Sequence, residues 1–200
     1  MKLSSAEKIM ESALLLFSEQ GYNETSINEI AKNAKVSEAT LFRLFNSKHE
    51  LYITTLETYS TKAFFSKNDT LVKLSFSDFI EDLNIIILDC YAFFFENIHL
   101  WRIYISNAIQ FKEISYLNNH IASQAYELIK MYLTEMQARN KNQVSSIETI
   151  TNLVYAHIFY SVTQITILRK ITDLDNSLKA ELRENSSTFL STIKKLFPYD

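Results

Sequence analysis

Glycine, proline and cysteine are almost absent from this chain, with one residue of each among 200. Tight hairpins and β-bulges depend on glycine, so their scarcity argues against an all-β fold and against a dinucleotide-binding α/β fold. The single glycine, Gly21, follows an apolar helical pattern and is expected in the left-handed conformation that ends a helix. Apolar residues make up 47% of the chain, which is ample for a core. The sequence therefore predicts an all-α protein.

A single cysteine excludes an internal disulfide and is typical of a reducing compartment. The first twelve residues mix lysine and glutamate with apolar residues, unlike a signal peptide. Residues 149–168 contain no charged residue and have the length of a membrane span, but eight of them are polar. This stretch is better interpreted as a helix buried within protein. We expect a cytoplasmic protein with no membrane partner.

The segment from Ser26 to Lys48 contains three helix starts. Ser26 is followed three residues later by Glu29, and Ser47 by Glu50, which are two capping boxes. Ser37 alone can cap the middle helix. Helices of roughly seven residues are not stable alone in water, so the middle one must be docked on its neighbours. This arrangement predicts a helix-turn-helix, whose second helix enters the major groove of DNA.

The same region resembles the TetR family of bacterial transcriptional regulators over about residues 5–51. The similarity lies in the helix IMESALLLFSEQGYNETS (9–26) and in SINEIAKNAKVSEATLFRLFNSKHEL (26–51). It implies an N-terminal three-helix helix-turn-helix domain, followed by a larger helical ligand-binding and dimerisation domain, with about nine helices in all. We expect the DNA-binding domain at 3–63, with its helix-turn-helix at about 26–45, and the second domain at 64–200.

Apolar periodicity predicts the helices and the one short linker, at 66–70. The helices are expected at about 5–20, in the helix-turn-helix, and at about 48–67, 76–96, 98–110, 114–139, 144–170 and 173–196. In the recognition helix, Ser37–Phe45, spacing turns Leu41, Leu44 and Phe45 inward. The residues expected at DNA are Ser26, Lys35, Ser37, Glu38, Ala39, Thr40, Phe42, Arg43 and Lys48.

Three of these side chains have chemistry that suits bases. Arg43 can bind guanine O6 and N7, or a phosphate; Thr40 can contact a thymine methyl group or a phosphate; and Glu38 can accept from cytosine N4. The resemblance assigns phosphate binding to Lys48. Each of these residues could instead be only a cap or a solvated charge. The net charge of −3 does not by itself suggest a nucleic-acid binder. The helix-turn-helix has a weak cationic excess, with four lysine or arginine residues against two glutamates. This excess predicts modest non-specific affinity, so recognition must come from base contacts or DNA shape.

Four positions depart from the family pattern. Lys35 replaces a glycine of the turn, which places a non-glycine residue at positive φ, at a cost of about 1 kcal/mol. Ala39 replaces another glycine and limits how closely the helix approaches the groove. Phe42 stands for a tyrosine, and Leu44 for a histidine or tyrosine, and both changes remove phosphate contacts.

The resemblance implies that the last two helices pair with their copies in a second subunit, so that two recognition helices read a palindrome. The alternative is that the apolar stripes of these two helices pack within one subunit. The residues expected at the dimer interface are Leu153, His157, Ser161, Ile165, Leu168, Leu182, Phe189 and Ile193.

Aromatic residues are dense after residue 60, and family members enclose a small-molecule pocket in this domain. An aromatic-lined pocket with few charges suits an apolar or amphipathic effector. The candidate wall residues are Tyr91, Phe94, Trp101, Tyr104, Tyr126, Tyr155 and His157. The alternative is that these side chains are simply core.

We expect no metal or other cofactor, since the four histidines are scattered and lack metal-ligand spacing. We also expect no enzyme activity, because the chain has no glycine-rich phosphate loop and no nucleophile elbow. The leading hypothesis is a homodimeric repressor released from a palindromic operator by a small ligand. The alternative is a helical interaction protein that keeps the fold but no longer reads DNA.

Overall fold

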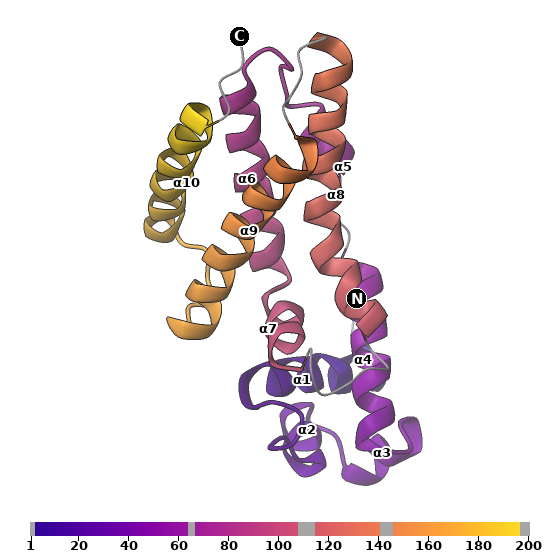
Figure 1. The fold of residues 1–200 in the computed structure, drawn as a ribbon. Coiled ribbons are helices and arrows are strands. Elements are labelled where there is room, and N and C mark those ends of the chain that lie inside the picture. Colours follow the sequence, from indigo (N-terminus) through magenta and orange to yellow (C-terminus); the bar gives the residue numbers. More distant parts are fainter. Residues whose placement is uncertain (1–2, 64–66, 108–114, 141–145, 197–200) are drawn as a thin grey trace. The chain divides into compact units, whose positions relative to one another are not determined.

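The computed structural model describes residues 3–63, 67–107, 115–140 and 146–196, and these residues form ten α-helices and one π-helical turn (Figure 1). The all-α prediction is confirmed. The elements are α1 Ser5–Gln20, α2 Ile27–Asn33, α3 Glu38–Leu44, α4 Lys48–Lys62, α5 Lys67–Leu71, α6 Phe79–Glu96, α7 Ile98–Asn107, α8 Ser115–Asn140, α9 Ile147–Thr163, the π-helical η2 Gln164–Leu168, and α10 Asn176–Leu196.

The short helix α5 corrects the sequence prediction, which placed a linker at 66–70 and ran the preceding helix on to about residue 67. Thr70 is buried, and its hydroxyl donates to Asp89 of α6 at 2.8 Å. Lys73 Nζ lies 2.6 Å from the same carboxylate. Contacts with α6 thus hold α5 in place. Such contacts cannot be recognised in the local sequence. The predicted end of the helix at about 98–110 lies outside the described residues.

Contacts divide the chain into two units, residues 1–64 with 97–121, and residues 65–96 with 122–200. In the first unit α1 packs against α2, α4 and α7. The division into a DNA-binding domain at 3–63 and an effector domain at 64–200 is functional and stays a prediction. The compact first unit differs from that domain in also containing α7.

The core of the first unit is built on α1. Ile9, Ala13 and Phe17 are almost fully buried, as their helical spacing predicts. The Phe17 ring meets Tyr52 of α4 edge-on, with 5.0 Å between centroids. Gly21 ends α1 at φ +87° and ψ 166°, and its N–H donates to the Phe17 carbonyl. The positive φ agrees with the prediction, but the ψ is extended rather than left-handed helical.

In the second unit α6 packs against both α9 and α10 (Figure 1). Asp82, buried near the start of α6, accepts from the Ser75 and Phe76 N–H groups, each at 2.8 Å. The Tyr132 hydroxyl of α8 donates to the same carboxylate at 3.2 Å. Asp82 therefore ties the loop before α6 to α8 without leaving a buried charge unpartnered.

Among the described residues no single helix is both long and apolar enough to span a membrane. Within the described part of the chain, only the consecutive helices α6 and α7 are long and apolar enough when they are taken together, and this holds by length and composition alone.

Candidate nucleic-acid interface and ligand pocket

Serine hydroxyls start each of the three helices between residues 26 and 62. The Ser26–Glu29 capping box is confirmed, with Glu29 N–H donating to Ser26 Oγ and Ser26 N–H donating to the Glu29 carboxylate. Ser37 caps α3 by accepting from Thr40 N–H at 3.1 Å. The second predicted box is only half formed. Ser47 accepts from Glu50 N–H, but the Glu50 carboxylate accepts from Asn46 instead.

The turn between α2 and α3 is held by a Schellman arrangement. Lys35 N–H donates to the Lys32 carbonyl and Val36 N–H to the Ala31 carbonyl. Lys35 sits at φ +56°, as predicted from its replacement of a turn glycine. Lys35 thus adopts positive φ without loss of its backbone hydrogen bond to Lys32, and its side chain is exposed.

One face of α3 is buried and the other faces outward. Leu41 and Phe45 are 0% and 5% exposed, as predicted. Leu44 is 39% exposed, so the prediction that it faces inward is wrong. The buried stripe consists of Leu41 and Phe45, which are four residues apart and therefore lie on one face of the helix. Leu44, the last residue of α3, lies beside this face. Phe42, at 47%, is also exposed.

The outward face of α3 carries the remaining candidate DNA contacts. Ala39 and Arg43 are exposed, and Arg43 forms no ion pair within the described part of the chain. Thr40 is half-buried, and its hydroxyl lies 2.9 Å from that of Ser37. The Glu38 carboxylate accepts a 2.6 Å hydrogen bond from the Asn28 amide of α2. Arg43 is therefore the candidate whose hydrogen-bonding groups are most available to DNA.

Lys48, at the start of α4, is partly occupied by contacts within the first unit. Its ammonium donates to the Asn23 carbonyl at 3.2 Å and lies 4.5 Å from the centre of the Tyr22 ring. Sequence reasoning assigned no site role to Asn28, Tyr22 or Asn23. Tyr22 lies within the stretch 9–26 that resembles the family, but no local signal links Asn28 to Glu38 across the turn.

The residues predicted to line an effector pocket do not form one cluster but are divided among separate side-chain contacts. In the second unit the Tyr91 hydroxyl is 3.0 Å from His157 Nε2, and the His157 ring stacks on Phe189 at 4.1 Å. Tyr126 and Tyr155 meet edge-on at 5.7 Å. Phe94 is fully buried in this unit. Trp101 and Tyr104 belong to the first unit, where their rings lie 5.3 Å apart.

Burial shifts the pKa of three side chains of the second unit. It lowers the pKa of His157 to about 4, so this imidazole is neutral at pH 7. It raises the pKa of Tyr91 to about 12, against a hydrogen bond with Ser161 that lowers it. Burial, followed by the neighbouring Asp89 charge, raises the pKa of Cys90, which fits an inert thiol.

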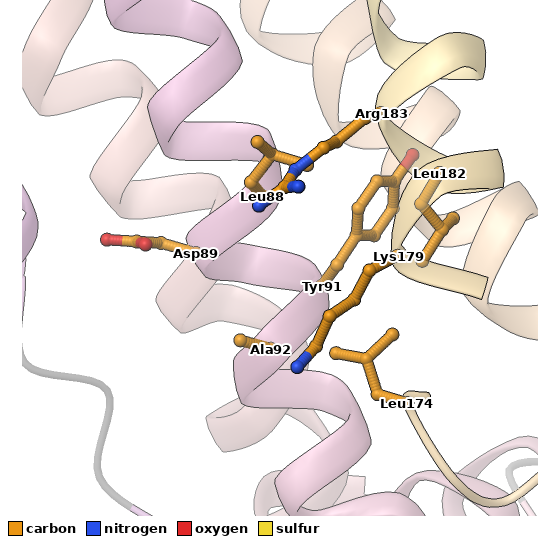
Figure 2. A pocket seen from close by; sticks show the side chains of 8 residues that line it. All are labelled: Leu88, Asp89, Tyr91, Ala92, Leu174, Lys179, Leu182 and Arg183. Atoms are coloured by element: carbon orange, nitrogen blue, oxygen red, sulfur yellow. The ribbon is translucent and has the colours of Figure 1, made fainter. Parts of the chain in front are cut away.

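A pocket of about 210 Å³ lies between α6, α10 and the loop before α10 (Figure 2). Tyr91 is the one predicted effector residue that lines it. Its rim carries the cations Lys179 and Arg183, which sequence reasoning missed. The two cations stand four residues apart on one helix, which is the only signal that could have paired them. The pocket is lined by Leu88, Asp89, Tyr91, Ala92, Leu174, Lys179, Leu182 and Arg183.

The predicted dimer residues divide into three groups. Ser161, Ile165, Leu182 and Ile193 are at most 8% exposed within one subunit and leave little surface for a partner. His157 and Phe189 cover each other by stacking. Leu153 and Leu168 are 37% and 75% exposed. Tyr160, which the prediction omitted, is 65% exposed on α9 between them.

The family model described as "Bacterial regulatory proteins, tetR family" matches residues 9–54. This segment belongs to the TetR family. It contains the capped helix-turn-helix and most of α4. Among the described residues no group of three or more histidine, cysteine or acidic side chains could hold a metal ion.

Two curated relatives share the TetR-type segment. The uncharacterized HTH-type transcriptional regulator YuxN of Bacillus subtilis is 45% identical over 56 residues, which cover 28% of this chain and 19% of that protein. The biofilm operon icaADBC HTH-type negative transcriptional regulator IcaR of Staphylococcus aureus is 41% identical over 46 residues, which cover 23% and 25%. The chain thus spans a quarter or less of these relatives.

The similarity to solved structures extends along nearly the whole chain. The transcriptional regulator FadR of Bacillus subtilis, solved in complex with stearoyl-CoA, matches with a TM-score of 0.63 over 92% of this chain and 97% of its own. The identity is 17%, so this match shows the fold alone.

Proposed function

We propose that this chain is a transcriptional repressor that binds a palindromic operator as a homodimer and is released by a small ligand. The observation that carries the proposal is the outward face of α3. On this docked, capped helix in a TetR-type segment, Arg43 is exposed and without an ion-pair partner in the described residues. IcaR, which shares this segment, is a negative transcriptional regulator, and this similarity favours repression over activation.

Recognition then follows from the geometry of α3. Arg43 reads guanine or holds a phosphate, while Ala39 and Thr40 approach the bases. Glu38, held by Asn28, acts chiefly to fix α3 against α2. Lys48 and the capped start of α4 contact the backbone and set the register of the helix. Ser26 and Ser37 act first as caps, and Lys35 adds a cation beside the turn.

The homodimer is proposed to form on the outer face of α9 and η2. Leu153, Tyr160 and Leu168 follow a spacing of seven and eight residues, so they lie on one helical face. No charged residue occurs from Thr149 to Leu168. An exposed apolar stripe without charge is typical of an interface rather than of a solvated surface. This face replaces the buried part of the predicted set.

The ligand is proposed to act on the second unit. FadR, whose fold this chain shares, was solved with stearoyl-CoA, an amphipathic molecule. A ligand weakens DNA binding only by its differential affinity for the two states of the protein. The apolar side chains of the second unit suit an apolar or amphipathic molecule of this kind.

Substitution at Arg43 tests the recognition surface. Arg43→Ala should weaken binding to a selected operator by about 5- to 150-fold, since a bidentate guanine contact contributes about 1–3 kcal/mol. Lys48→Ala should have a smaller effect, because its ammonium already binds Asn23. The matched control is Lys194→Ala, which removes a cation from α10. Equal affinities for the Arg43→Ala variant and the control would refute this assignment.

Introduction of a negative charge into the apolar stripe tests the dimer. Tyr160→Glu and Leu168→Glu should convert dimer to monomer in sedimentation equilibrium. Val72→Glu is the control, since Val72 is 82% exposed but lies outside α9. An unchanged dimer in both stripe variants would place the interface elsewhere.

One observation favours a second candidate function. Phe42 and Leu44, both exposed on the recognition face, present apolar surface where family members place phosphate contacts. An interaction protein that no longer reads DNA would use this surface to bind a protein partner. In that case purified protein would bind selected and random DNA equally weakly.

A further inference from the structure

The pocket between α6 and α10 has walls of a kind suited to an apolar group (Figure 2). Leu174 and Leu182 line one side and Ala92 the other, with the Tyr91 ring between them. The Tyr91 hydroxyl is already engaged by His157, so this residue offers the pocket chiefly its ring. A volume of about 210 Å³ is below the roughly 300–1,000 Å³ of pockets for drug-sized ligands. The pocket suits a small molecule, or one end of a longer one.

The rim of this pocket is positively charged. Lys179 and Arg183 are four residues apart on α10, and both are exposed. Figure 2 shows their side chains leaving α10 toward α6 on either side of the Tyr91 ring. In the described part of the chain neither forms an ion pair. Like charges at this spacing repel each other, and an anion between them would relieve that repulsion.

The one acidic residue of the pocket does not neutralise these cations. Asp89 accepts from the Thr70 hydroxyl at 2.8 Å and pairs with Lys73 at 2.6 Å. In Figure 2 its carboxylate points away from Lys179 and Arg183. The pocket therefore combines an apolar interior with a cationic rim, which is the complement of a molecule with an anionic group and a short apolar part.

We propose that this pocket binds an anionic amphiphile, with its carboxylate or phosphate group between Lys179 and Arg183 and its apolar part against Leu174, Leu182 and Tyr91. An anionic amphiphile is a narrower class of ligand than the apolar or amphipathic effector of the proposed function. The role of this ligand as an effector rests on the proposed function, but its binding to the pocket does not. Charge complementarity at the rim gives specificity, and apolar burial gives most of the affinity.

Equilibrium dialysis of the full chain, without DNA, tests the site with octanoate, octyl phosphate and 1-octanol as probes. Saturable binding of at least one anion, weaker at high salt and tighter than that of the neutral alcohol, is expected. Lys179→Gln and Arg183→Gln should each weaken anion binding by about three- to tenfold. Lys194→Gln, the same change elsewhere on α10, should not. The tighter-binding anion identifies the headgroup.

A second variant separates the pocket from general surface charge. Ala92→Leu adds volume to the pocket wall and should abolish binding of both anions while leaving the thermal midpoint nearly unchanged. The proposal is overturned if neither anion binds saturably, if 1-octanol binds equally well, or if all three glutamine variants behave alike. Because no DNA is present, any of these outcomes leaves the proposed DNA binding standing.

Discussion

The Asn28 amide of α2 donates a 2.6 Å hydrogen bond to the Glu38 carboxylate of α3. This bond crosses the turn and joins the two helices through their exposed sides, whereas Ile30 and Leu41 are fully buried. We propose that this bond makes Glu38 a residue that positions α3 rather than one that reads a base. An acidic side chain facing phosphates would otherwise oppose DNA binding.

Replacing Asn28 tests this positioning role. Asn28→Ala should lower the free energy of unfolding by less than about 1 kcal/mol, because the bond is exposed to solvent. Operator affinity should fall by a larger factor than this loss implies, since the released carboxylate repels the backbone. Chemical denaturation and fluorescence anisotropy measure the two effects. Glu24→Ala, an exposed acid of the same unit, is the control. Unchanged operator affinity would return Glu38 to the list of base readers.

The positive φ of Lys35 predicts a stabilising substitution. Lys35→Gly removes the left-handed strain and should raise the free energy of unfolding by about 1 kcal/mol. The same change at Lys32, inside α2, should lower it by about 0.5–1 kcal/mol. Both variants lose one lysine, so the opposite signs of the two changes in the free energy of unfolding report the effect of the backbone conformation. Urea denaturation measures both, and equal signs would contradict the account of the turn.

His157 predicts a dependence of stability on pH. Burial lowers its pKa from 6.5 to about 4, so between these values the unfolded chain binds more protons than the folded one. The contribution is present above pH 6.5 and is lost as the pH falls toward 4. The stability of His157→Gln should therefore fall less steeply over this window, as measured by urea denaturation at several pH values.

A matched replacement controls for the loss of an imidazole. His49→Gln changes an exposed histidine of the first unit. If the wild-type-minus-variant stability difference follows the same pH curve for both replacements, burial of His157 is not the cause.

Local features of this protein could be predicted from sequence, because their physics is local. Ser26 and Ser37 cap the helices that follow them, and Lys35 adopts the positive φ that its place in the turn requires. The buried stripe of α1 follows from its periodicity.

Features that depend on contacts between distant segments could not be predicted in this way. The helix α5 rests on the hydrogen bond from Thr70 to Asp89, and the Asn28–Glu38 bond spans ten residues. Leu44 is exposed because α3 docks on its neighbours through Leu41 and Phe45. Ile165 and Leu182 belong to an apolar pattern that suits a dimer and a subunit core equally well. The cationic pocket is formed by α6 and α10, which lie about ninety residues apart in the sequence.

Fluorescence anisotropy with the DNA flanking the gene of this protein measures whether it binds DNA sequence-specifically. A scrambled duplex and a salt series complete the experiment, followed by selection of bound fragments from the whole genome. We expect at least one palindromic fragment to bind two subunits about a thousandfold or more tighter than scrambled DNA. Equal, weak and steeply salt-dependent binding to every fragment would contradict it.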